Sequence, residues 1–352
     1  MLLTLAVPAL SMRLSFPDSS TQPHGTSGYA SHRILAGGFG AGYEAPLVMV
    51  AESGSRAAVL QVADAVRRTP GVAATTPPRV SRDGAAVIFI AYPTTGAQDP
   101  ATTRLVHRLR DVVLPAATAA TAGTAAAAGT AGTGPRVHVG GPNAGTIDFA
   151  DDVASRLPWL IAVVVGLSLL LLVALVRSLV IALQAAVMNI LSIAAAYGVL
   201  VAVVQWGWLR GIFGFPTQLP VTAWVPLFMF PILFGLSMDY QVFLVSRMRE
   251  EYEGGRDTRE AVTRGLARTA RVITAAAAIM VMVFLSVLFG ADVGVKQIGL
   301  GLGVAVLIDA TIVRMVLVPA IMELCGQANW WLPGVTPRRG GYRRADRAAS
   351  PR

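Results

Sequence analysis

Four ionisable side chains interrupt long apolar stretches of this sequence: Asp239, Asp309, Arg314 and, near the end of a stretch, Glu323. A charged side chain at the centre of a bilayer costs about 2.5–3.5 kcal/mol on insertion scales. Such side chains therefore face a bundle interior or a cavity, and they often mark the path of a proton or an ion. A static polar contact between helices is the alternative for each of them. Aspartates on two different helices favour the functional interpretation.

Asp239 is the first candidate for proton binding. Burial and a neighbouring cation shift the pKa of a carboxyl group in opposite directions, so Asp239 could take up and release a proton as its surroundings change. Tyr240 follows directly and can donate a hydrogen bond or pass a proton. Because adjacent residues point about 100° apart on a helix, we expect Tyr240 to serve a partner on another helix.

Asp309 and Arg314 lie five positions apart, which is about 140° around an α-helix. This is not the i,i+4 spacing of an intrahelical ion pair. We therefore expect Asp309 to meet a partner on a neighbouring helix. Arg314 would pair elsewhere or extend toward the membrane surface, where an interface anchor is the alternative interpretation.

Small residues surround these charged positions and predict close helix packing, because they let helix backbones approach. They are Gly235, Ser237, Gly299, Gly301 and Gly303.

The composition excludes a soluble enzyme. Apolar residues make up 54% of the 352 residues and charged residues 14%, with a mean hydropathy of +0.59, whereas soluble proteins carry about 25% charged residues. The net charge is +9, and arginines cluster in 247–271 and 338–352, beside apolar stretches. This placement indicates cytoplasmic membrane flanks rather than nucleic-acid binding.

Other chemistries find no support in the sequence. The single Cys325 excludes an internal disulfide and a cysteine-based metal cluster, and the four histidines lack metal-ligand spacing. No ATP-binding lysine motif is present. We therefore expect neither a cofactor nor a metal, and no enzymatic activity.

The chain divides into a soluble and an apolar part. Residues 1–11 are apolar but shorter than the about 20 residues that cross a bilayer, so they read as the remnant of a spanning helix. Residues 12–157 have ordinary soluble composition, and the Ala/Thr/Gly tract 116–134 predicts a flexible loop. Periodicity predicts a small α+β domain, with strands over 45–52, 84–92 and 137–140 and helices over 55–69 and 102–114.

The remaining residues predict a helical membrane bundle with a basic tail at 324–352. Charge-free stretches place five spanning helices near 158–176, 180–206, 222–246, 271–290 and 297–323. If the arginine-rich segments are cytoplasmic, residues 12–157 lie outside the cell membrane and the C-terminus lies inside.

The stretch 234–252 (FGLSMDYQVFLVSRMREEY) resembles the tenth transmembrane helix of the MMPL (mycobacterial membrane protein large) transporters of the RND superfamily. Further segments agree with this resemblance, which covers nearly the whole chain apart from 116–134. They are 140–148 (GGPNAGTID), the Leu157-Pro-Trp motif, 205–208 (QWGW), 264–276 (RGLARTARVITAA), 299–319 (GLGLGVAVLIDATIVRMVLVP) and 330–333 (WWLP).

The resemblance implies an exporter that is driven by the proton gradient and carries lipids or other large hydrophobic molecules. Asp239 and Tyr240 match the Asp–Tyr pair that relays protons in the family, and Asp309 and Arg314 match a functional pair in its last helix. Residues 12–157 would be an extracytoplasmic porter domain with a ferredoxin-like core. The membrane helices would be half of an RND fold.

Family members have twelve membrane helices and two porter domains, so the resemblance begins inside the seventh helix. An N-terminal half on another chain, or a second copy of this chain, would then complete the bundle. The alternatives are a non-transporting membrane scaffold or regulatory half, a truncated fragment of such an exporter, and an accessory of protein export.

Overall fold

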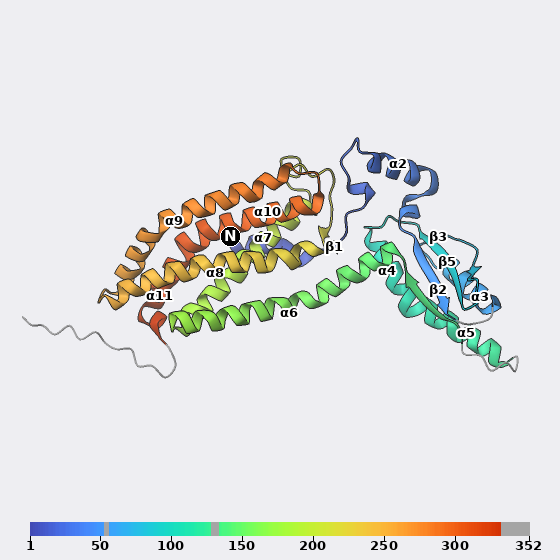
Figure 1. The fold of residues 1–352 in the computed structure, drawn as a ribbon, viewed down its shortest axis with the longest axis horizontal. Helices are drawn as coiled ribbons and strands as arrows, with labels where there is room; N and C mark the ends of the chain where they lie inside the picture. The colour runs from blue at the N-terminus through green and yellow to red at the C-terminus, as the bar shows by residue number, and fades with distance from the viewer. Residues whose placement is uncertain (53–55, 128–133, 332–352) are drawn as a thin grey trace, which may run out of the picture.

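The computed structural model describes residues 1–52, 56–127 and 134–331. These residues form a bundle of long helices and a smaller α/β domain at one end of it, and one long helix, α6 (Pro142–Val176), joins the two (Figure 1).

Five helical segments are long and apolar enough to cross a membrane, which confirms the predicted number of spans in the described residues. The chain is therefore a multi-pass membrane protein. Besides α6, the segments are α7 (Leu179–Val204), α8 (Trp224–Glu253), α9 (Thr258–Ser286) with η5 (Val287–Phe289), and a last helix formed by α10 (Val293–Ile308), η6 (Asp309–Leu317), α11 (Val318–Cys325) and η7 (Gly326–Trp330).

The helix that contains the first span begins earlier than the predicted span of 158–176, with a charged part before the apolar stretch. The Leu157-Pro-Trp motif suggested a helix start because proline favours the first helical position, but Pro158 lies inside α6. The start is set by Gly141, whose φ of 95° ends the preceding strand, and by Pro142 at the first helical position. The boundary between the two parts of the protein thus falls within a continuous helix.

The helix α7 is the central element of the bundle. Of the most apolar 18 residues of α7, 67% are buried inside the protein, whereas the share is 11% for the corresponding residues of α6 and of α9. The last helix approaches its neighbours closely, because a Cβ atom at Gly299, Gly301 or Gly303 would collide with residues of α9, η5 or α8. The outer faces of α6 and α9 are left for lipid or for another protein chain.

The N-terminal residues also pack against α7. Helix α1 (Leu2–Ala6) and η1 (Val7–Ser11) form one short apolar segment, and a Cβ atom at Gly198 of α7 would overlap the Leu5 carbonyl. Beyond this segment, strand β1 (Leu14–Ser15) pairs in parallel with β7 (Val221–Thr222), just before α8. The chain that leads to the α/β domain is thereby attached to the start of α8.

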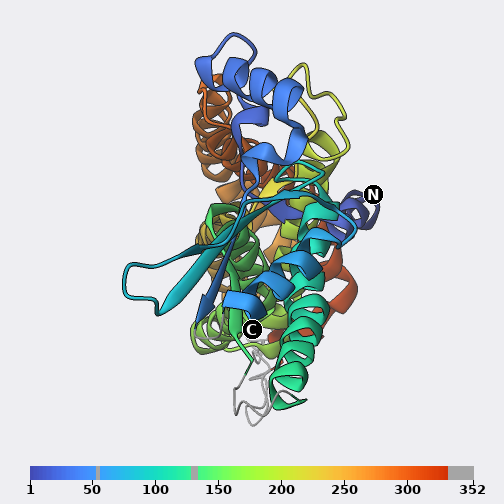
Figure 2. The same ribbon diagram turned by 90° about the vertical axis from the view of Figure 1, so that its right-hand side faces the viewer.

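The α/β domain has a five-stranded antiparallel sheet in which β3-β5-β2-β6 follow one another and β4 also pairs with β5, with helices on one side of it (Figure 2). Along the chain, its elements are β2 (Leu47–Glu52), α3 (Arg56–Arg67), β3 (Val72–Thr75), β4 (Arg79–Val80), which pairs with β5, β5 (Ala86–Pro93), α4 (Pro100–Arg108), η4 (Leu109–Val113), α5 (Leu114–Ala127) and β6 (Arg136–Gly140). Alternate residues of β2, such as Leu47 and Met49, are fully buried. They form a core with α3 and α4.

Three features of this domain differ from the sequence prediction. The tract 116–134 was expected to be a loop, but α5 continues to Ala127, because alanine is the strongest helix former. Residues 128–133 of this tract lie outside the described part, as does 332–352 of the basic tail. The prediction also missed the strands β3 and β4 and the helix α2 (Ser27–Phe39). The side chain of Thr26 caps α2.

A buried carboxylate connects helices at the end of the bundle that lies away from the α/β domain. Glu251 of α8 is 4% exposed and pairs with Arg256 and with Arg268, whose Nη1 lies 2.5 Å from Glu251 Oε1. Next to it, the rings of Tyr252 and Trp330 stack 4.3 Å apart. Glu251 therefore connects α8 and α9, and the adjacent stack connects α8 to the end of the last helix.

Replacement of Glu251 by glutamine should lower the free energy of unfolding by about 1–2 kcal/mol, because hydrogen bonds to a charged group are lost while both arginines stay partly hydrated. Thermal unfolding in detergent would measure this. The matched control is Glu260→Gln, since Glu260 is 46% exposed and pairs with Arg264, and it should change stability by less than about 1 kcal/mol. Equal effects of the two substitutions would contradict the structural role of Glu251.

Candidate functional site

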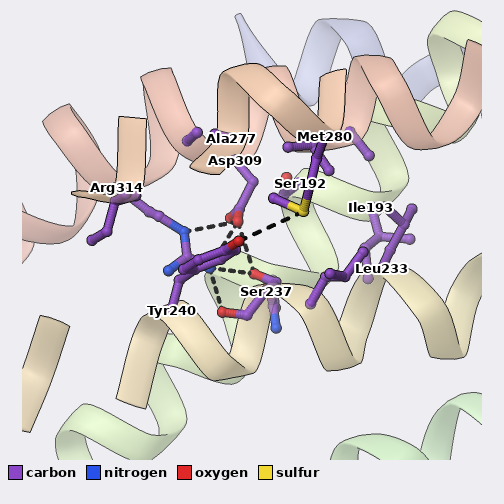
Figure 3. Close-up of a pocket in the computed structure, with 15 residues that line it drawn as sticks. Ser192, Ile193, Leu233, Ser237, Tyr240, Ala277, Met280, Asp309 and Arg314 are labelled. Carbon is purple, nitrogen blue, oxygen red and sulfur yellow. Dashed lines mark hydrogen bonds and ion pairs between the residues drawn. The ribbon is translucent and has the colours of Figure 1, made fainter. Parts of the chain in front are cut away.

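A small cavity lies inside the bundle between α7, α8, α9 and the last helix (Figure 3). Its volume is about 20 Å³. Six of its lining residues are polar or charged: Asn189, Ser192, Ser237, Tyr240, Asp309 and Arg314. The rest of the lining is mainly aliphatic, with Ile193, Leu233, Ile273 and Met280 among it. The cavity therefore places a polar cluster in apolar surroundings.

Asp309 and Arg314 form a direct ion pair, so the prediction that they point apart is wrong. The Nε and Nη2 atoms of Arg314 each lie 2.8 Å from Asp309 Oδ2. The physical reason is that residues Asp309–Leu317 form a π-helix, whose i→i+5 repeat brings residues five positions apart onto one side. The side chain of Arg314 is 1% exposed, so it is not a surface anchor.

Ser237 connects this ion pair to α8 and α7. Arg314 Nη2 donates to the carbonyl oxygen of Ser237 and to its Oγ at 2.9 Å. The same Oγ lies 3.0 Å from Asp309 Oδ2 and within hydrogen-bond distance of Asn189 Oδ1. Ser237, expected as a helix-packing residue, is therefore also a hydrogen-bonding partner of both charged groups.

Tyr240 faces other helices and not Asp239, as the helical geometry predicted. The guanidinium group of Arg314 lies over its ring, 5.2 Å from the centroid, which is a favourable cation–π arrangement. Its hydroxyl donates to the Sδ atom of Met280 on α9 at 3.6 Å. Tyr240 thereby completes the polar cluster from the α8 side.

Asp239 lies outside this cluster. Its side chain is exposed on the surface of α8 and makes no hydrogen bond or ion pair with any described residue. Gly235, one turn earlier, is exposed as well, and a Cβ atom placed on it would meet no described atom within 4 Å. The close packing expected at Gly235 is therefore not made within this chain. Gly235 and Asp239 together mark an uncovered strip of α8.

The sequence analysis missed Asn189 and Met280. Asn189 lies in the apolar stretch of α7, where a polar amide is itself a signal of a helix–helix contact. Asn189 Nδ2 and Arg314 Nη1 are buried without a partner among the described residues. A cavity of this volume has room for one water molecule, so these donors can hold a water beside the ion pair.

The two aspartates of this region have different surroundings. Asp309 is the partner of a buried cation, whereas Asp239 is exposed on α8 and has no partner among the described residues. Ser237 lies two positions before Asp239 on α8 and contacts both members of the ion pair. The helix that carries Asp239 is thereby in direct contact with Asp309 and Arg314.

Comparisons with known proteins give consistent results. The model of the MMPL family matches residues 44–352. The membrane protein YdfJ of Bacillus subtilis is 35% identical over 337 residues, 94% of this chain. The mycolic acid-containing lipids exporter MmpL11 of Mycolicibacterium smegmatis is 36% identical over 344 residues, 95% of this chain. The trehalose monomycolate exporter MmpL3 of Mycobacterium tuberculosis is 34% identical over 243 residues, 69% of this chain.

The chain spans only part of these relatives. The matched regions cover 44% of YdfJ, 34% of MmpL11 and 25% of MmpL3.

Proposed function

The chain belongs to the MMPL family, and we propose that it forms the C-terminal half of an exporter that uses the proton gradient to move lipids or other hydrophobic molecules across the cell membrane. The relatives MmpL11 of Mycolicibacterium smegmatis and MmpL3, which are named as exporters of mycolic acid-containing lipids and of trehalose monomycolate, support this substrate class.

The observation that carries the proposal is the buried ion pair of Asp309 and Arg314 with its partner Ser237. Two charges deep in a helical bundle are unfavourable unless they are paired, and replacement by apolar residues is often neutral or stabilising. Intramembrane charges of this kind commonly serve proton relays. Asp239, Tyr240, Asp309 and Arg314 would then form the relay of this half.

The open strip at Gly235 and Asp239 supports a partner in the membrane. An aspartate on a lipid-facing surface is costly, and a glycine beside it permits a second helix to approach closely. We propose that an N-terminal half on another chain, or a second copy of this chain, covers the strip and supplies the second half of the relay.

The α/β domain would be the porter domain on the outer side of the membrane. Apart from the two-residue strand β4, its β-α-β-β-α-β order and the antiparallel strand order β3-β5-β2-β6 support a ferredoxin-like core. Arginines between 247 and 271 gather at the opposite end of the bundle, which supports a cytoplasmic location for that end.

One proton that crosses 100 mV supplies about 2.3 kcal/mol, so export against a steep gradient would use several protons for each molecule. A scaffold or regulatory half that does not transport is the alternative function. It would keep the same fold without any dependence on protons.

Proteoliposomes distinguish the two functions. The full chain, purified with any membrane protein that accompanies it, would be tested with a lipophilic fluorescent dye and an imposed pH gradient. We expect the dye to move with the gradient and to stop when nigericin collapses it. No movement under either condition, with the protein intact and oriented, would favour the scaffold.

A further inference from the structure

A second cleft lies in the α/β domain, apart from the membrane cavity. It has a volume of about 200 Å³ and is formed by the turn before β3, the end of β5 and the exposed side of α4. Its lining consists of Pro70, Gly71, Thr94, Thr95, Ala101, Arg104, Leu105 and Arg108. The cleft is thus about ten times larger than the cavity inside the bundle.

Two arginines give this cleft its charge. Arg104 and Arg108 are four positions apart on α4 and therefore lie on one side of the helix. Neither guanidinium group has a carboxylate partner among the described residues, and no acidic side chain lines the cleft. The nearby Asp99 caps α4 instead, accepting a hydrogen bond from the Ala101 N–H at 2.8 Å.

The floor of the cleft is apolar or already satisfied. Leu105 is 5% exposed and lies beside Gly71, where a Cβ atom would come within 3.5 Å of it. The Thr94 N–H donates to the Gly71 carbonyl at 2.9 Å, and the Thr95 and Thr102 hydroxyls are 2.7 Å apart. The two guanidinium groups remain as donors for a ligand above an apolar floor.

The cleft also lies close to the bundle. Helix α4 is at the end of the domain that faces the membrane helices (Figure 1). The loop before α4 contacts the chain that leads into the bundle, because Gln98 Nε2 donates to the Phe16 carbonyl at 3.0 Å. With the domain outside the membrane, as proposed above, a lipid headgroup at the outer surface is within the reach of this region.

We propose that this cleft binds the phosphate headgroup of an anionic amphiphile. Arginine forms forked hydrogen bonds with phosphate oxygens, and Pro70 and Ala101 offer an apolar surface to the adjoining glycerol or acyl carbons. Free phosphate shares the headgroup chemistry but gains nothing from that surface. The role of the site in export rests on the proposed function, whereas binding itself requires no proton gradient.

Titration of the full chain in a nonionic detergent tests this binding. The probes are 1-oleoyl lysophosphatidic acid, 1-oleoylglycerol, which has the same acyl chain without phosphate, and inorganic phosphate. We expect lysophosphatidic acid to bind, inorganic phosphate to compete only at higher concentration, and 1-oleoylglycerol not to compete. Competition by 1-oleoylglycerol as strong as that of lysophosphatidic acid would overturn the proposal. Equal affinity for inorganic phosphate would overturn the lipid assignment.

Substitutions locate the site on the protein. Arg104→Gln with Arg108→Gln should weaken binding of lysophosphatidic acid by about tenfold or more, as expected for lost charge-assisted hydrogen bonds. The control Arg82→Gln removes an exposed arginine of the same domain outside the cleft and should leave affinity within about twofold. Unchanged binding by the double variant, or an equal loss in the control, would contradict the assignment. The single variants serve if the double variant unfolds.

Discussion

Replacement of Asp239 by asparagine is expected to abolish transport driven by a pH gradient while leaving the folded chain as stable as the wild type. Asparagine keeps the shape of the side chain but cannot bind and release a proton. The loss of a proton-transferring group typically lowers a rate by about a hundredfold or more. Stability should hold because the side chain is exposed on α8 and has no partner among the described residues.

Two measurements on the same preparation test this expectation. Thermal unfolding in detergent reports stability, and dye transport in proteoliposomes reports function. The matched control is Asp111→Asn, which makes the same substitution at an exposed aspartate of the α/β domain and should transport normally. Transport by Asp239→Asn at the wild-type rate would remove Asp239 from the relay.

Replacement of Asp309 by alanine should have the largest effect on stability. Arg314 is 1% exposed, and its ion pair with Asp309 is the contact that compensates its charge. The loss of one partner from a buried pair destabilises a protein by about 3–5 kcal/mol, because the other charge stays buried without compensation. The unfolding temperature in detergent should fall accordingly, and transport should be lost.

The double variant Asp309→Leu with Arg314→Met separates folding from function. It removes both charges and keeps apolar volume, so it should recover most of the stability that the single variant loses. It should nevertheless fail to transport, because the polar cluster is gone. A double variant as unstable as Asp309→Ala would show that the charges act on folding through other contacts. A double variant that transports would contradict the proposed role of the pair.

The sequence was sufficient for the membrane part of the fold because long charge-free stretches have few structural alternatives. The number of spans and the identity of the intramembrane charges follow directly from it. The start of α6 does not, because Pro158 resembles a helix start but is tolerated inside a membrane helix. The alanine-rich α5 shows the same limit, since low complexity resembled a loop while the helix propensity of alanine prevailed.

The geometry of the site was harder to predict than its composition. Asp309 and Arg314 could be chosen from the sequence, but their contact depends on a local π-helix that α-helical spacing does not anticipate. Asp239 and Tyr240 are adjacent in sequence, yet only Tyr240 lines the cavity, because neighbouring residues point in different directions on a helix. Helix packing, and not local sequence, determines that the face of α8 with Tyr240 is covered and the face with Asp239 is exposed.

The most direct test of the account follows proton entry and dye exit together in one proteoliposome preparation. A pH-sensitive dye trapped inside would report protons, and a lipophilic dye would report transport. The account predicts that the wild-type protein couples the two fluxes and that Asp239→Asn loses both of them. Dye exit that continued at the wild-type rate after proton entry had stopped would contradict it.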